Sequence, residues 1–146
     1  MFDKLLVPVD GSQRALKAAA VAGEIARKFG SQVKLLYVQH FPDTILATSG
    51  MAGMVAPGPA IVEALEEAAR EVLRAARESL GLPQDRVTQE VLLGHPAETV
   101  CRVAEEGGYD LIVMGSRGLS EVRAFFLGSV SDKVSHHAPC PVLVVR

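Results

Sequence analysis

Short, mainly apolar runs alternate along the chain with longer stretches in which apolar residues recur every three or four positions. The short runs are typical of strands buried in a parallel sheet, and they cover residues 5–9, 33–38, 111–114 and 142–145. Residues 87–93 mix polar and apolar side chains, which predicts a more exposed strand near an edge. The longer stretches have the period of a helix and cover residues 15–29, 61–80, 96–106 and 130–137.

Helix boundaries are marked by residues with known preferences. Ser12 is a good helix N-cap, Pro96 suits a first helical position, and Gly30 and Gly81 follow predicted helix ends. Strands that alternate with helices throughout predict one α/β domain over residues 1–146, with a doubly wound parallel sheet of five strands and helices on both faces.

Residues 40–59 follow neither period and contain three glycines and three prolines. A loop of this length is uncommon inside a compact domain. Its apolar residues Met51, Met54 and Val55 leave two interpretations open, a lid over a ligand or a mobile insertion.

Composition narrows the class of protein. The chain has 146 residues, of which 49% are hydrophobic and 22% charged, as expected for a globular domain with a real core. The net charge of −2 argues against a non-specific nucleic-acid binder. Neither a signal peptide nor a membrane-spanning stretch of roughly 20 apolar residues is evident, and two separate cysteines suit a reducing compartment. We therefore expect a cytoplasmic protein without a membrane partner.

Two predicted strand ends carry the residues with most chemical interest. Asp10 follows the first strand, and Gly115 follows the fourth. The carboxyl ends of parallel strands lie at the same edge of a sheet, which is where ligands bind in open α/β folds. Asp10 either contacts a ligand there or simply caps the turn with Ser12.

Glycine spacing after the fourth strand favours a phosphate site. Two residues separate Gly115 from Gly118, nine separate Gly118 from Gly128, and Ser129 follows at once. Glycines allow close approach to an oxygen-rich ligand, and the helix that begins here offers N–H groups and a partial positive charge to phosphate. Hydroxyls of Ser129 and Ser131 are further donors. The alternative is that these glycines serve only turns and caps.

These motifs carry a resemblance to a known family. The run from Gly115-Ser116-Arg117-Gly118 through Gly128-Ser129 to Pro139-Cys140-Pro141 resembles the ATP-binding branch of the universal stress proteins. Val7-Pro8-Val9-Asp10-Gly11-Ser12 and Gly94-His95-Pro96-Ala97-Glu98 are similar to the opening strand and the middle of the same family. The resemblance covers the chain apart from residues 40–59, and it implies the strand order 3-2-1-4-5.

The resemblance also implies where ATP is held. Pro8, Val9 and Asp10 then line the adenosine, with Asp10 near the ribose, and Val38 offers backbone groups to the adenine. The residues that follow the ribose and phosphates are Met114, Gly115, Ser116, Gly118, Gly128, Ser129, Val130 and Ser131. A divalent ion, Mg²⁺ or Mn²⁺, sits on the phosphate oxygens and has no protein ligand. Arg117 either reaches a phosphate or is solvated.

No constellation of catalytic residues stands out. The chain lacks GxSxG, the Walker GxxxxGK and a GxGxxG after the first strand, and no base is placed to activate water. We expect a binding and regulatory module, with a slow ATP hydrolase or a binder of AMP or cAMP as alternatives. His136, His137 and Cys140 lack the spacing of a zinc site. An apolar last strand, Val142–Val145, at the sheet edge favours a homodimer.

Overall fold

A computed structural model of the protein describes residues 1–40, 58–117 and 127–146. Five parallel strands form the sheet, namely β1 (Lys4–Val9), β2 (Gln32–Gln39), β3 (Val87–Leu93), β4 (Leu111–Gly115) and β5 (Val142–Val145). The helices that the structure describes are α1 (Gln13–Phe29), α3 (Pro59–Leu80), α4 (Pro96–Gly107) and α5 (Ser129–His137), with a short 3₁₀ turn at Gln84–Arg86. Each predicted strand and helix is confirmed within two residues at its ends.

The sheet has the order β3-β2-β1-β4-β5, as the resemblance implied. Consequently β3 and β5 are its two edges, and the more polar pattern of β3 matches its edge position. The chain passes from β1 outward to β3 and then returns to β4 beside β1. This reversal between β1 and β4 leaves their carboxyl ends without a crossing connection directly above them.

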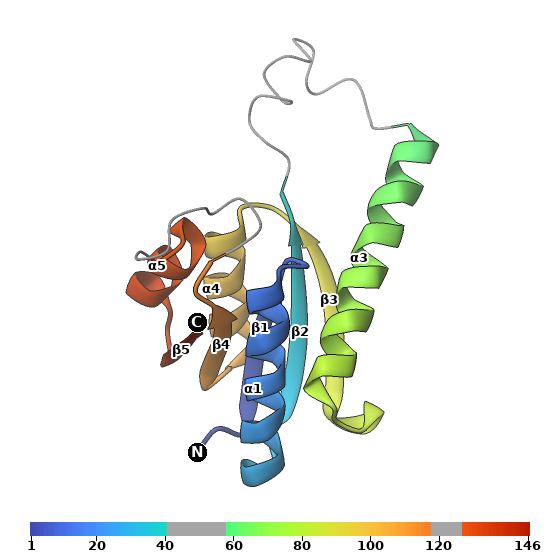
Figure 1. Cartoon of the computed structure of the whole chain (residues 1–146). Helices are drawn as coiled ribbons and strands as arrows, with labels where there is room; N and C mark the ends of the chain where they lie inside the picture. Colours follow the sequence, from blue (N-terminus) through green and yellow to red (C-terminus); the bar gives the residue numbers. More distant parts are fainter. Residues whose placement is uncertain (41–57, 118–126) are drawn as a thin grey trace.

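Helices cover both faces of the sheet (Figure 1). Side chains of α1 and α3 pack on one face around Leu5, Val7 and Leu35. Side chains of α4 and α5 pack on the other around Leu6, Leu36 and Ile112. Alternate residues of β1 therefore serve opposite cores, which explains why the strand is apolar throughout.

Helix α1 shows how local residues set the boundaries. The Ser12 hydroxyl accepts a hydrogen bond from Ala15 N at 3.2 Å and caps the first turn. At the other end Gly30 adopts φ +75°, and its N–H donates to the carbonyl of Ala26. Between the two caps α1 buries mostly alanines and Gly23, so it lies close against the sheet and against α3.

The amino-terminal part of α3 is less buried than the rest of the helix. Ile61 and Val62 remain 56% and 40% exposed, whereas Leu73 and Leu80 are buried. The predicted loop interior, residues 41–57, and residues 118–126 lie outside the described residues. Over the described helices, none combines the length and the apolar character that a bilayer-crossing segment requires.

Candidate functional site

The carboxyl ends of β1 and β4 lie side by side, because these strands are parallel neighbours (Figure 1). Val9 and Met114 are buried at the top of the two strands. Pro8 and Asp10 are half-buried. The structure thus brings together the two strand ends that the sequence analysis selected.

The turn after β1 is held by its own side chains. One Asp10 carboxylate oxygen, Oδ1, accepts a hydrogen bond from Ser12 N at 2.9 Å. Gly11 adopts φ +88°, a conformation that favours glycine. Asp10 therefore does cap the turn with Ser12, and the capping bond uses Oδ1 only.

Val38 lies at the same edge, one strand further along. In the parallel register Val9 is opposite Tyr37, so Val38 stands one residue beyond the level of Val9. Its side chain is half-buried and packs on the core beneath α4 and α5. This position is compatible with the predicted backbone contact to an adenine ring.

Ser116 connects β4 to the start of α5. Its side chain is 3% exposed, and its N–H donates to the Val145 carbonyl at 2.8 Å. The Ser116 carbonyl accepts from Gly128 N at 2.6 Å and from the Ser131 hydroxyl at 2.7 Å. One residue thus fixes the first turn of α5 directly beside the end of β4.

The start of α5 has the features expected of an anion site. Gly128 is the N-cap and has no side chain, so this residue itself provides no side-chain cap to the first turn of the helix. Ser129 is exposed and Val130 half-buried at this end. The Ser131 hydroxyl, by contrast, donates within the protein, to Ser116 O and also to Gly128 O at 3.1 Å. The hydroxyl of this buried residue is therefore used within the protein and not as the ligand donor that the sequence analysis expected.

Gly115 is required by packing as well as by any ligand. A Cβ built on Gly115 would lie 2.9 Å from the Arg14 carbonyl carbon and 3.1 Å from Ala15 N. These are backbone atoms of the first turn of α1, which cannot move aside cheaply. Gly118, the next glycine of the motif, lies outside the described residues, and Arg117 before it is half-buried.

The sequence analysis did not single out Arg14, which belongs to the same region. Its Nη1 donates to the Ser116 hydroxyl at 2.8 Å. The available signal was a basic residue in the first turn of a helix, where the helix dipole disfavours positive charge. Periodicity alone gives no reason to notice such a residue.

Comparison with known proteins identifies the family. The model of the universal stress protein family matches residues 1–146. The chain belongs to the universal stress protein family.

Members of the family match the chain over its whole length. Universal stress protein YxiE of Bacillus subtilis is 35% identical over 150 residues and covers 100% of both chains. A universal stress protein of Thermus aquaticus is 38% identical over 150 residues, again with 100% of both chains covered. The resemblance on which the sequence analysis relied is therefore confirmed at the level of the family.

Solved structures agree in fold. Hypothetical protein MJ0577 superposes with a TM-score of 0.78 at 28% identity, covering 99% of this chain and 96% of its own. A universal stress protein in complex with cAMP gives a TM-score of 0.66 at 26% identity, with the same coverage. Both matches extend over the strand ends and the start of α5.

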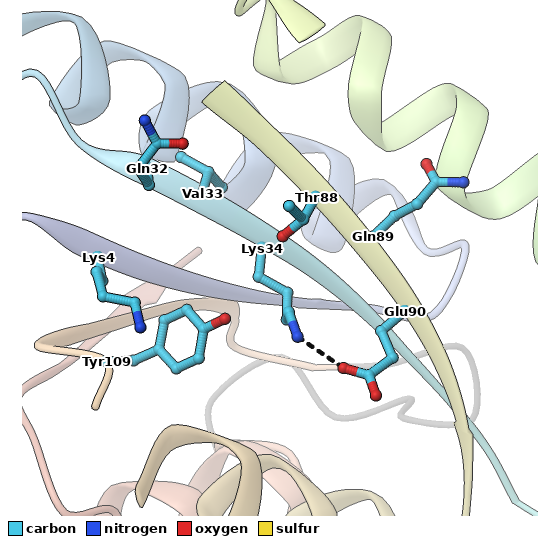
Figure 2. A pocket seen from close by; sticks show the side chains of 8 residues that line it. All are labelled: Lys4, Gln32, Val33, Lys34, Thr88, Gln89, Glu90 and Tyr109. Atoms are coloured by element: carbon cyan, nitrogen blue, oxygen red, sulfur yellow. Dashed lines mark hydrogen bonds and ion pairs between the residues drawn. The ribbon is translucent and has the colours of Figure 1, made fainter. Parts of the chain in front are cut away.

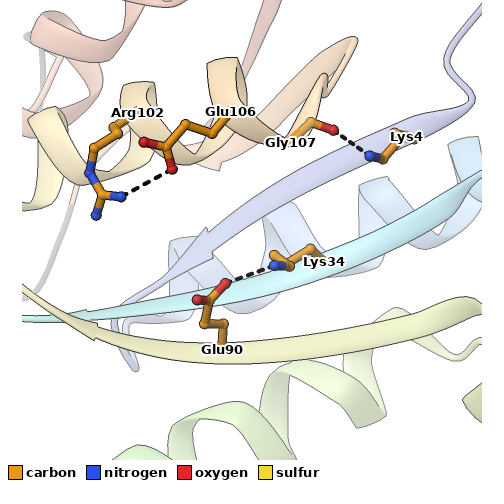
Figure 3. Close-up of polar contacts among 6 residues, drawn as sticks. All are labelled: Lys4, Lys34, Glu90, Arg102, Glu106 and Gly107. Atoms are coloured by element: carbon orange, nitrogen blue, oxygen red, sulfur yellow. Dashed lines mark hydrogen bonds and ion pairs between the residues drawn. The ribbon is translucent and has the colours of Figure 1, made fainter.

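This universal stress protein also has a cavity of about 460 Å³ near the amino ends of β1, β2 and β3, away from their carboxyl ends. It is an open depression on the sheet, as Figure 2 shows. Its lining comprises Lys4, Gln32, Val33, Lys34, Thr88, Gln89, Glu90 and Tyr109. Both lysines already have partners, since Lys34 forms an ion pair with Glu90 at 2.7 Å and Lys4 donates to the Gly107 carbonyl at the end of α4 (Figure 3).

Cysteine and histidine side chains of this family member have contacts within the protein. Cys101 and Cys140 are free thiols beside the core under α4 and α5, and burial raises the pKa of both. His136 Nδ1 contacts the Asp132 carbonyl at 2.8 Å. Within the described residues, no three or more histidine, cysteine, aspartate or glutamate side chains are grouped to hold a metal ion.

Proposed function

We propose that this universal stress protein is a regulatory module that binds ATP at the carboxyl ends of β1 and β4. The observation that carries the proposal is the attachment of α5 to β4 through Ser116, at 2.6 Å to Gly128 N and 2.7 Å to the Ser131 hydroxyl. This attachment holds the start of α5, whose N-cap is a glycine, beside the sheet edge where α/β folds bind ligands.

Each part of ATP has a matching part of the site. Pro8, Val9 and Asp10 are proposed to line the adenosine, and Val38 to meet the adenine with its backbone. Gly128, Ser129 and the N–H groups of the first turn of α5 receive the phosphates, because a helix N-terminus favours negative charge. Gly115, Gly118, Gly128 and Ser129 have the spacing of the ATP-binding branch.

A divalent ion, Mg²⁺ or Mn²⁺, is proposed to arrive with the phosphates. When bound, it neutralises phosphate charge and needs no dedicated protein cage. The donors proposed at the start of α5 are backbone N–H groups and the Ser129 hydroxyl, which suit phosphate oxygens rather than a metal ion. The residues present therefore fit a nucleotide that carries its own cation.

Regulation rather than catalysis follows from the groups that surround the site. Among the described residues at the carboxyl ends of β1 and β4, Asp10 has the carboxylate that could act as a base. One of its two oxygens already accepts a hydrogen bond from Ser12 N. Slow hydrolysis of ATP is the alternative within the same site. A single-turnover assay with Mg²⁺ or Mn²⁺ distinguishes the two, and a rate clearly above that of the buffer would favour the hydrolase.

The structure of one relative supports a different adenine nucleotide as the alternative ligand of this site. A universal stress protein with 26% identity has been solved in complex with cAMP. AMP or cAMP is therefore the alternative occupant of the adenosine side. We also propose that the protein acts in the cytoplasm, since Cys101 and Cys140 are both free thiols, as is usual in a reducing compartment.

Ser129→Asp tests the phosphate site. The new carboxylate suits the start of a helix, so the protein should be as stable as the wild type or slightly more stable, by up to about 1 kcal/mol. The same charge should repel phosphates and weaken ATP binding at least about tenfold, the effect of roughly 1.4 kcal/mol. Isothermal titration calorimetry with ATP, AMP and cAMP measures both the affinity and the preferred ligand.

Ser135→Asp is the matched control, because Ser135 lies on the same helix but six residues beyond Ser129. It should leave ATP binding nearly unchanged. The nucleotide released by denaturing the purified protein gives an independent reading of the ligand. If neither that release nor titration detects any adenine nucleotide, the proposed function is wrong.

A further inference from the structure

Arg14 occupies an unfavourable place for a cation. It is the second residue of α1, and the first turn of this helix contains no acidic residue. A helix N-terminus carries about half a positive charge, so a guanidinium there is repelled by its own helix. Arg14 is also half-buried, which reduces the compensation that water gives to its charge.

The protein supplies Arg14 with a neutral partner only. In the part of the chain that the structure describes, its one hydrogen bond is from Nη1 to the Ser116 hydroxyl, and no carboxylate lies within ion-pair distance. Arg27, Arg70, Arg74 and Arg102 are different, because each pairs with a glutamate one turn away. A guanidinium has five N–H donors, so Arg14 retains donors and an uncompensated charge.

The position of this charge is next to the proposed phosphate site. Within the described residues, Ser116 links the Arg14 guanidinium to the first turn of α5, since its hydroxyl accepts from Arg14 and its carbonyl accepts from Gly128 N. The absence of a side chain on Gly115 brings the backbone of Arg14 against β4. One residue therefore connects the guanidinium to the helix start, and its charge adds to the positive end of the α5 dipole.

We propose that Arg14 is a specificity-determining residue that makes the affinity of this site rise with the number of phosphate groups on the nucleotide. The inference rests on the proposed function, because it needs a nucleotide with its phosphates at α5. The anion would supply the opposite charge that Arg14 lacks within the protein. Ser116 would hold the guanidinium in one orientation, so that its charge acts on the phosphates and not on bulk water.

Affinities for ATP, ADP and AMP in four proteins test the proposal. The wild type and Arg14→Lys retain the charge, whereas Arg14→Gln keeps most of the length and can still donate to Ser116. Lys17→Ala removes one positive charge from the same helix, three residues or about 4.5 Å further from the strand ends. Calorimetry at two ionic strengths gives the dissociation constants, and circular dichroism during heating shows that each variant is folded.

Arg14→Gln should lose about tenfold or more in affinity for ATP, less for ADP and little for AMP, which is the effect of losing one charge-assisted contact. Arg14→Lys should retain the preference for ATP over AMP, and its binding should weaken with salt as in the wild type. Lys17→Ala should bind all three nucleotides with nearly wild-type affinity.

Three results would overturn the inference. The first is an unchanged affinity for ATP in Arg14→Gln, and the second is an equal loss for all three nucleotides, which indicates a merely structural role. The third is an equal change of the ratio in Lys17→Ala, which indicates a general effect of charge. All three require a wild type that binds nucleotide, so they leave the proposed function intact. A wild type that binds none of the three would instead contradict the proposed function itself.

Discussion

At the scale of single residues, the end of β4 has no space for a side chain at position 115. Gly115 faces backbone atoms of Arg14 and Ala15 at 2.9 and 3.1 Å from a hypothetical Cβ. The neighbouring Ser116 uses its N–H, its carbonyl and its hydroxyl in hydrogen bonds. This glycine and this serine together bring α1, β4 and α5 to one point.

Gly115→Ser should therefore destabilise the protein by about 1–3 kcal/mol, the usual cost of forcing extra atoms into a filled site. Gly58→Ser is the control, because Gly58 is exposed, has no atom within 4 Å of a hypothetical Cβ and is a helix N-cap, where serine is favoured. Urea denaturation gives both free energies of unfolding. Equal stability of the two variants would show that the first turn of α1 can shift to make room for a side chain at position 115.

The ion pair between Lys34 and Glu90 makes a prediction about pH. A hydrogen bond from Lys34 to Glu90 raises the pKa of the lysine above its usual 10.5, against the opposing effect of burial. A raised pKa in the folded state means that the stabilisation is complete below 10.5 and is lost as the pH rises through the higher, folded value. Half-exposure and screening by salt limit its size to about 0.5–1 kcal/mol.

Glu90→Gln should thus be less stable than the wild type by a constant amount from about pH 7 to 9, and the difference should shrink above about pH 10.5. Chemical denaturation across this range measures it. Glu67→Gln, which breaks the exposed pair with Arg70, is the control, because arginine does not titrate there. A difference that stays constant up to pH 11.5 would disprove the contribution of the lysine.

At the scale of the elements, the sequence predicted which helices and strands exist, but it predicted poorly which residues of different elements touch. Alternation and helical period mark strands and helices because they report which faces are buried. They do not report which backbones touch. Gly23 in the middle of α1 looks like a weak helical residue, yet a Cβ there would lie 2.0 Å from the Leu80 carbonyl oxygen of α3. The Arg14 contact with Ser116 joins residues 102 positions apart, and no local pattern reveals it.

The docking of α5 on β4 gives a test at this scale. Ser131→Ala removes the buried hydrogen bond to the Ser116 carbonyl and should cost about 1 kcal/mol of stability. ATP affinity should fall as well, because the first turn of α5 loses one of its two attachments to Ser116. Ser135→Ala, which removes an exposed hydroxyl bonded within the helix, is the control for both measurements. Unchanged affinity in Ser131→Ala would show that Gly128 N alone holds the helix start.

At the scale of the whole molecule, the two edges of the sheet differ. β3 presents mixed side chains, among them Gln89 and the paired Glu90, along its seven residues. β5 is short and entirely apolar, and Leu143 on it is 38% exposed. An uncharged apolar edge favours pairing with another strand, so a homodimer through β5 remains our prediction.

Proline substitution tests the dimer at one edge while the other serves as control. The Pro141 and Val145 carbonyls accept hydrogen bonds from Ile112 N in β4 and from Ser116 N just after it. Because hydrogen bonding alternates along a strand, the backbone N–H and C=O groups of Val142 and Val144 point away from β4. Val144→Pro removes an outward N–H without breaking the hydrogen bonds to β4. Because proline cannot donate to a strand ladder, this variant should be a monomer at ~10 µM protein, where the wild type is a dimer. Light scattering measures both. On β3, Gly94 N donates to Gln39 O, which by the same alternation points Val91 outward, so Val91→Pro should leave the dimer intact. A wild type that is monomeric under these conditions would contradict the homodimer, and a dimer lost only in Val91→Pro would place the contact at β3 instead of β5.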